Sequence, residues 1–136
     1  MKPPRSLARK PPSADDIVAI GEAVLAELGS EVQALVGDVA IAVEDWPGDD
    51  VLDELGIEDA LDLTGLYCAV PVGERLAMNA PPSRPEMIFL YRLPILVEWC
   101  QRGCALHEVV FDVLTHEIGH HFGMDEAAVL RMEGRG

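Results

Sequence analysis

The sequence has little positive charge, and its middle has none. No lysine or arginine occurs between Lys10 and Arg75, and the formal net charge of the 136-residue chain is −14. Acidic residues crowd part of this interval: Asp45, Asp49, Asp50, Asp53, Glu54, Glu58, Asp59 and Asp62. A surface of this charge repels phosphate backbones, so nucleic acid is excluded as an expected partner. We interpret the acidic run as a solvated face, with attraction for a basic partner or peptide as the alternative.

Long apolar runs are also missing from the sequence. No segment approaches the apolar length of a membrane span, and Met1 to Pro12 is basic and proline-rich, without the apolar stretch of a signal peptide. We therefore expect a cytoplasmic protein without membrane contact, in which residues 1–12 form a disordered tail and residues 13–136 form one domain. We also expect a monomer.

Cysteines and aromatic residues are both scarce. The three cysteines, Cys68, Cys100 and Cys104, lack the framework of a secreted disulfide scaffold, so we expect them to be buried free thiols. Aromatic residues make up 5% of the chain, whereas 49% of it is hydrophobic. The core must therefore consist mainly of aliphatic side chains, and a chain of this length can form it without covalent staples.

Helical and extended patterns follow one another along the chain. Ser13 is an expected N-cap for a helix whose apolar positions run from Ile17 to Leu28, with Gly29 as its stop. Short apolar runs predict strands at 39–43, 66–72 and 86–92, and a helical turn is expected over 51–55. Helices are expected over 95–100 and 105–122, separated near Gly103. This order predicts an α+β domain with a small mixed sheet, an N-terminal helix and a C-terminal helix.

The helix expected over 105–122 carries two stripes of residues spaced four apart. The apolar stripe, which is expected to pack on the sheet, consists of Val110, Leu114, Ile118 and Phe122. The polar stripe consists of Glu108, Asp112, His116 and His120. Two histidines one turn apart on the same face can direct their rings to one metal ion.

Glu117 follows the first of these histidines. The resulting pattern, His-Glu-x-x-His on a helix, is a known arrangement in zinc hydrolases. Zinc held there would lower the pKa of a water molecule to about 7 and polarise a scissile carbonyl. Glu117 is the predicted general base, which takes a proton from the water and passes it to the leaving group.

A catalytic zinc ion usually has a third protein ligand. Gly123 is expected to end the helix and let the chain turn back, and Asp125 and Glu126 follow at once. We predict Glu126 as the third ligand because of its offset from His120. Asp125 is the neighbouring alternative, and Glu133 or an upstream acid are further ones.

Other residues near the motif have less direct assignments. His121 points round the helix from His116, so it is predicted to pack or to support the site rather than to bind the metal. His107 is expected at the surface. Asp112 is either a hydrogen-bond acceptor for a ligand histidine or an ordinary surface carboxylate. Gly119 costs helix stability, and a close backbone approach would explain it.

The segment HEIGHHFG, residues 116–123, resembles the signature of the bacterial minimal zincin-like metallopeptidases, a family of short single-domain proteins. Two upstream stretches, 63–67 and 88–95, are also similar to that family. The resemblance implies a zincin-like core with the active-site helix beneath a small sheet, zinc held by His116 and His120, and Glu117 as general base. It implies aspartate where this chain has Glu126, and glutamate also binds zinc.

In zincins generally, an edge strand beside the cleft pairs with an extended peptide substrate. By analogy, we predict that the strand over 88–91 is this edge strand. Tyr67, Tyr91 and Arg92 would then be able to approach a carbonyl oxyanion.

The leading functional hypothesis is a zinc-dependent peptidase that acts on peptides or exposed protein segments, because a purely structural zinc site has no use for Glu117. The alternative is a metal-stabilised binding or regulatory domain with little proteolysis. A metal-dependent nuclease is a third class, which the charge of −14 disfavours.

Overall fold

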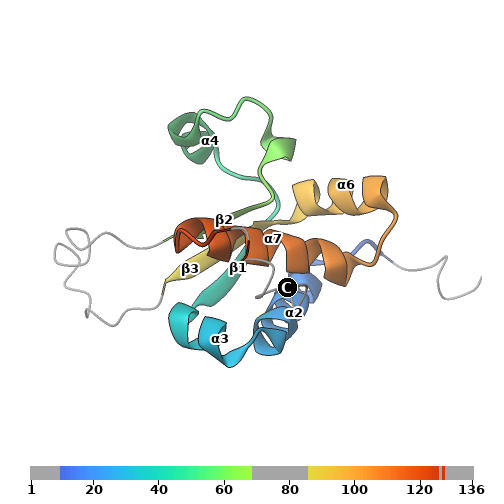
Figure 1. The fold of residues 1–136 in the computed structure, drawn as a ribbon. Helices are drawn as coiled ribbons and strands as arrows, with labels where there is room; N and C mark the ends of the chain where they lie inside the picture. The colour runs from blue at the N-terminus through green and yellow to red at the C-terminus, as the bar shows by residue number, and fades with distance from the viewer. Residues whose placement is uncertain (1–9, 69–85, 126, 128–136) are drawn as a thin grey trace, which may run out of the picture.

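The predicted helices and strands form close to their predicted positions (Figure 1). The computed structural model describes residues 10–68, 86–125 and 127. Along the chain, its elements are α2 (Ala14–Glu27), α3 (Ser30–Val36), β1 (Ala40–Glu44), α4 (Asp49–Leu55), the 3-10 helix η1 (Ala60–Asp62), β2 (Gly65–Cys68), β3 (Met87–Tyr91), α6 (Arg92–Arg102) and α7 (Leu106–His121). The predicted α+β class and the mixed sheet are confirmed.

The order of the strands differs from the prediction. The described sheet has the order β1-β3-β2, in which β1 is parallel and β2 antiparallel to β3. The prediction that residues 88–91 form an edge strand is therefore wrong, because β3 is hydrogen-bonded on both sides and has no free edge for a substrate. The edge strand that packs against α7 is β2.

The first helix begins as predicted at Ser13. The Ser13 hydroxyl accepts a hydrogen bond from the Asp16 N–H at 3.1 Å, and the Asp16 carboxylate accepts one from the Ser13 N–H at 2.8 Å. This reciprocal capping box satisfies two backbone donors at the start of α2. The stop predicted at Gly29 is confirmed, because α2 ends at Glu27 with Leu28 as its C-cap. Gly29 is also the N-cap of α3, a helix that the sequence pattern did not predict. With only seven residues, α3 is too short to show a helical periodicity.

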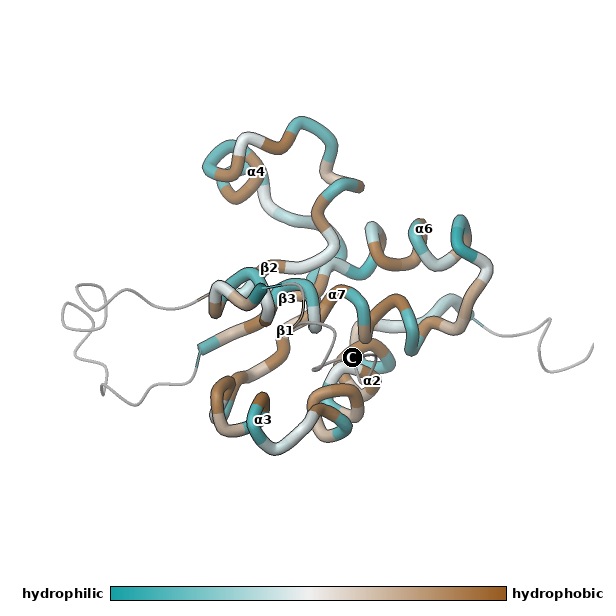
Figure 2. Tube along the Cα trace, in the orientation of Figure 1, coloured by the Kyte–Doolittle hydropathy of each residue, from teal (hydrophilic) through white to brown (hydrophobic). Residues whose placement is uncertain are grey.

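The main core lies between the sheet and helices α2 and α7, where apolar segments gather (Figure 2). The predicted apolar stripe of α7 is confirmed: Val110, Leu114 and Ile118 are fully buried, and Phe122 is partly buried. A smaller cluster of Leu52, Leu63 and Tyr91 attaches the segment with α4 and η1, which stands out from the body of the fold (Figure 1). The main core holds α7 in place and so determines which face of this helix stays exposed.

Gly65 lets α7 pack closely against β2, and this contact makes a testable prediction. A Cβ at Gly65 would lie 2.7 Å from Val113 Cγ1 and 3.2 Å from the Phe89 carbonyl oxygen. We expect Gly65→Ala to lower the free energy of unfolding by about 1–3 kcal/mol, because one side chain and one strand must shift. Denaturant titration of the wild type and the variant would measure this change in the free energy of unfolding. Gly29→Ala is the control, since nothing lies within 4 Å of a Cβ there. Equal stabilities of the two variants would contradict the close packing.

The cysteines are less buried than predicted. Cys68 and Cys104 are half-buried and Cys100 is exposed, so the prediction of buried thiols is wrong for Cys100. Gly103 has φ of 65° and ends α6, which leaves Cys100 in the last turn of that helix on its outer side. In the part of the chain that the structure describes, none of the three cysteines forms a disulfide bond.

Parts of three predictions lie outside the described residues. These are the first nine residues of the predicted tail, the end of the strand predicted over 66–72, and the third ligand Glu126. The described part of the chain contains no helix with the length and apolar character needed to cross a bilayer.

Candidate metal centre

Helix α7 exposes the two histidines of the motif. Its opposite side is the buried apolar stripe, so His116 and His120 are both solvent-exposed. Within the described residues, neither imidazole forms a hydrogen bond with another side chain or with the backbone. Two free imidazoles one turn apart on one helix face are a suitable pair of donors for zinc.

Glu117 lies at the border between this exposed face and the core. Its side chain is half-buried. Burial raises the pKa of its carboxyl, while the charges of His116 and His120 and a hydrogen bond from the Tyr67 backbone N–H act in the opposite direction. The net shift is upward, so Glu117 is a stronger base than an exposed glutamate.

The hydrogen bond to Glu117 comes from the outer edge of β2, which pairs with no further strand among the described residues. The Tyr91 N–H donates to the Thr64 carbonyl at 2.9 Å, and Tyr67 lies opposite Ile88. In an antiparallel pair, hydrogen-bonded positions alternate with positions whose backbone groups point outward. Gly65 and Tyr67 are therefore the β2 residues whose N–H and C=O groups face away from β3, toward the side of Glu117.

The ring of Tyr67 packs against the last turn of α7. It stacks on the His121 ring with centroids 3.9 Å apart and an interplanar angle of 12°. Phe122 meets the Tyr67 ring edge-on at 5.6 Å and the His121 ring edge-on at 4.8 Å. His121 also lies 3.7 Å from the Glu86 carboxylate. His121 is therefore a packed side chain, as its place on the helix predicted.

The helix ends where the sequence places its stop. Gly123 has φ of 63°, and the Met124 N–H donates to the Gly119 carbonyl at 2.8 Å, so the chain turns back after one residue in the left-handed region. Asp125 follows this turn and is exposed. Over residues 10–68, 86–125 and 127, no three histidine, cysteine or acidic side chains form a metal-binding group. The predicted third ligands Glu126 and Glu133 both lie outside these ranges.

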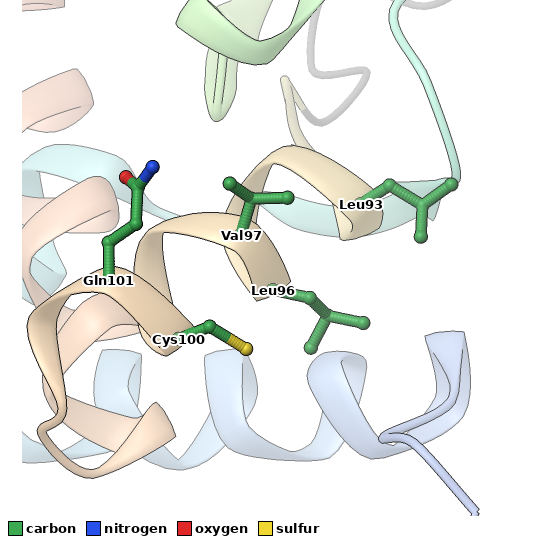
Figure 3. A pocket seen from close by; sticks show the side chains of 5 residues that line it. All are labelled: Leu93, Leu96, Val97, Cys100 and Gln101. Carbon is green, nitrogen blue, oxygen red and sulfur yellow. The ribbon is translucent and has the colours of Figure 1, made fainter.

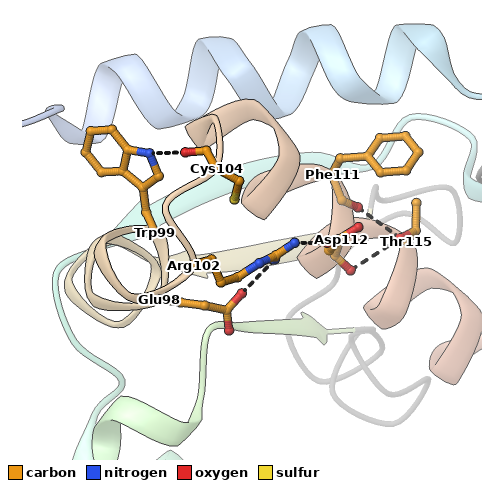
Figure 4. Close-up of polar contacts among 7 residues, drawn as sticks. All are labelled: Glu98, Trp99, Arg102, Cys104, Phe111, Asp112 and Thr115. Carbon is orange, nitrogen blue, oxygen red and sulfur yellow. Dashed lines mark hydrogen bonds and ion pairs between the residues drawn. The ribbon is translucent and has the colours of Figure 1, made fainter.

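Two other residues of α7 pair with neighbouring helices. His107 Nε2 lies 3.2 Å from Glu27 at the end of α2, with both side chains about half exposed. Asp112 accepts from Arg102 Nη2 at 2.7 Å, and Arg102 also pairs with Glu98 at 3.2 Å (Figure 4). These contacts fasten α7 to α2 and α6, so Asp112 serves at least as a link between helices.

Figure 4 also shows a hydrogen bond of Trp99 at the turn between α6 and α7, and one of Thr115 within α7. The Trp99 indole N–H donates to the Cys104 carbonyl at 2.8 Å, and the buried Thr115 hydroxyl donates to the Phe111 carbonyl at 2.9 Å. The first bond closes the turn between the helices, and the second satisfies a hydroxyl inside the core.

Arg92 and Tyr91, the predicted oxyanion contacts, have different surroundings. Arg92 donates to the Pro12 carbonyl at 2.7 Å and pairs with Asp45 at 3.3 Å, so its guanidinium ties the start of α2 to the end of β1. Tyr91 is buried, and burial, followed by the charge of Glu44, raises its pKa to about 12. Glu117 is the smallest of the charges that raise this pKa.

An apolar groove lies along α6, lined by Leu93, Leu96, Val97, Cys100 and Gln101 (Figure 3). None of these residues belongs to the motif or its supporting contacts. The groove therefore does not contribute to the candidate metal centre.

Sequence reasoning missed the part that Tyr67 plays through its backbone and its ring. The sequence suggested Tyr67 as a strand aromatic and as an oxyanion contact through its side chain, whereas its outward N–H follows from a strand order that local patterns do not encode. Glu86 was missed for the same reason, since its place beside His121 depends on how β3 is paired.

Comparison with known proteins agrees with the assignment based on the His-Glu-x-x-His motif and the fold around it. A family model described as zincin-like metallopeptidase matches residues 36–135, a range that covers β1 to the end of α7 and beyond. No curated protein matches the chain. On this match, together with the helix that carries His116, Glu117 and His120, the chain belongs to the zincin-like metallopeptidase family.

Proposed function

We propose that the protein is a zinc-dependent peptidase in which Glu117 is the general base. The observation that carries this proposal is the position of Glu117, half-buried between two exposed imidazoles and the free edge of β2. A carboxylate whose pKa is raised by burial suits proton transfer near neutral pH better than an exposed one.

His116, His120 and, as predicted from the sequence, Glu126 would hold the zinc ion. When bound, zinc lowers the pKa of a water molecule and polarises the carbonyl of a peptide bond. Glu117 would accept the proton of the attacking water and deliver it to the amine of the leaving segment, so that no free charge builds up on either. The hydrogen bond from Tyr67 holds the carboxylate toward the strand.

The substrate would be an extended peptide that pairs with the outer edge of β2. Gly65 and Tyr67 offer N–H and C=O groups there, and a strand added to a sheet edge gains its affinity from such groups. This assignment replaces the predicted pairing with residues 88–91. The edge lies beside Glu117, so a peptide bound to it would cross the face that bears the histidines.

Metal dependence tests the proposal directly. We expect the zinc-loaded protein to cleave members of a diverse peptide library, to lose cleavage when a chelator removes the metal, and to recover it when zinc is restored. Cleavage is measured by mass spectrometry of the products. Cleavage that survives complete metal removal would contradict the proposal. Firm zinc binding without cleavage of any peptide would favour the metal-stabilised binding domain.

A further inference from the structure

Tyr67 contacts α7 at two points that lie one turn apart. Its backbone N–H donates to Glu117, and its ring stacks on His121. Glu117 and His121 are four residues apart and therefore share one side of the helix. His116 directly precedes Glu117, and His120 directly precedes His121. Any rotation of α7 about its axis would therefore move the two histidines of the motif together with the two residues that contact Tyr67.

The stack is built tightly into the fold. Tyr67 is 7% exposed, and its ring meets His121 nearly face to face and Phe122 edge-on. Contacts of this kind between aromatic rings have preferred geometries and therefore restrain the orientation of both rings. His121 and Phe122 are the last residue and the C-cap of α7, so the stack restrains the last turn of the helix, which carries His120.

The hydroxyl of Tyr67 is not accessible to a substrate in this arrangement. The oxygen atom is fully buried and lies near the Glu86 carboxylate. Burial is the largest of the influences that raise its pKa, followed by the nearby Glu86 carboxylate. A substrate carbonyl cannot reach a hydroxyl that solvent cannot reach, so the predicted oxyanion contact does not apply to Tyr67.

We propose that Tyr67 is a positioning residue of the metal centre, which fixes the rotation of α7 through Glu117 and the ligand-bearing turn through the His121 ring. This inference rests on the proposed zinc site. It assigns His121 a role as the ring on which Tyr67 stacks, not as a metal ligand. It also means that the edge strand that would receive the substrate is the element that orients the site.

The test compares variants that keep the stack with variants that remove it. Tyr67→Phe and His121→Phe keep two stacked rings, whereas Tyr67→Leu and His121→Ala do not. His107→Ala is the control, since His107 lies on the same helix and pairs with Glu27. Two readouts apply to each protein: zinc affinity by competition with a colorimetric chelator, and the visible spectrum of the cobalt-substituted protein. Thermal unfolding of the zinc-free proteins identifies variants that lose their fold.

We expect Tyr67→Leu and His121→Ala to lose about 10-fold in zinc affinity and to change the cobalt spectrum, as residues that orient ligands do. The two phenylalanine variants should rescue both readouts, and His107→Ala should resemble the wild type. If Tyr67→Leu does not fold, His121→Ala decides the question, because that side chain is 26% exposed at the helix end and tolerates truncation.

Three results would overturn the inference. Zinc affinity that is unchanged in both truncated variants would show that the stack positions nothing. Loss of zinc in His121→Phe as large as in His121→Ala would make His121 a ligand. Wild-type zinc affinity with lost cleavage in Tyr67→Phe would show that the hydroxyl acts on the substrate. Zinc binding without any peptide cleavage would refute only the proposed peptidase, because the affinities decide the positioning role independently.

Discussion

Glu117→Gln is expected to abolish peptide hydrolysis while the protein keeps its zinc. Glutamine has nearly the shape of glutamate, and its amide oxygen can still accept the hydrogen bond from the Tyr67 N–H. It cannot take a proton from water at neutral pH. General-base catalysis contributes roughly 10²–10⁴-fold to a rate, so cleavage should fall by about that factor. Turnover of a cleaved peptide and metal content by mass spectrometry measure the two properties separately.

The same substitution should not weaken the fold. Burial raises the pKa of Glu117 above its value in the unfolded chain, so the stability that is present below the unfolded pKa is lost as pH rises through the folded pKa. At neutral pH the buried charge costs free energy that glutamine does not. The zinc-free variant should therefore melt no lower than the zinc-free wild type. A loss of hydrolysis in Glu117→Gln would then result from the missing base and not from a loss of the fold.

Glu108→Gln provides the matched control for this experiment. Glu108 lies on the polar stripe that includes His116 and His120, but in the first turn of α7, where it is exposed. The chemical change is identical, and the distance from the motif is more than two turns. If both variants cleave as fast as the wild type, Glu117 is not the base and the proposed mechanism fails.

Loss of zinc from single-ligand variants is the second large effect that we expect. Purified wild-type protein should contain about one zinc ion per chain. His116→Ala, His120→Ala and Glu126→Ala should each lower zinc affinity by more than about 100-fold, which is the upper range for removal of an outer-shell partner. Metal content by mass spectrometry, followed by competition with a chelator, measures the loss.

Asp125→Ala is the comparison that identifies the third ligand. Asp125 directly follows the turn at Gly123 and is exposed, and in the described part of the chain it does not join the two histidines in a three-donor group. We therefore expect Asp125→Ala to keep its zinc. If it loses zinc and Glu126→Ala does not, Asp125 is the ligand. If neither loses zinc, Glu133 or an upstream acid takes that place.

A wild-type protein that takes up no zinc at all would have a different meaning. The polar stripe of α7 would then be only the wet face of an amphipathic helix, and the peptidase proposal would fall with it. Family membership would remain, because the match over residues 36–135 does not depend on metal content.

Local sequence patterns were sufficient to predict the helix that carries the His-Glu-x-x-His motif. The four-residue spacing that buries Val110, Leu114 and Ile118 also places His116 and His120 on the exposed side, because both follow from the helical repeat. The turn at Gly123 and the capping box at Ser13 are local as well: each depends on a backbone conformation or a hydrogen bond within a few residues. The three residues of the motif could therefore be proposed without a structure.

Only the tertiary structure decided which strand borders the site. The segments 65–68 and 87–91 both have the composition of strands, and nothing within either segment says that β3 pairs on both sides while β2 keeps a free edge. Strand order depends on contacts between residues far apart in the chain, and a local pattern carries no record of them. For the same reason, local patterns did not predict the surroundings of Tyr67 and Arg92. The Tyr67 ring packs against His121, and long-range contacts join Arg92 to Pro12 and Asp45.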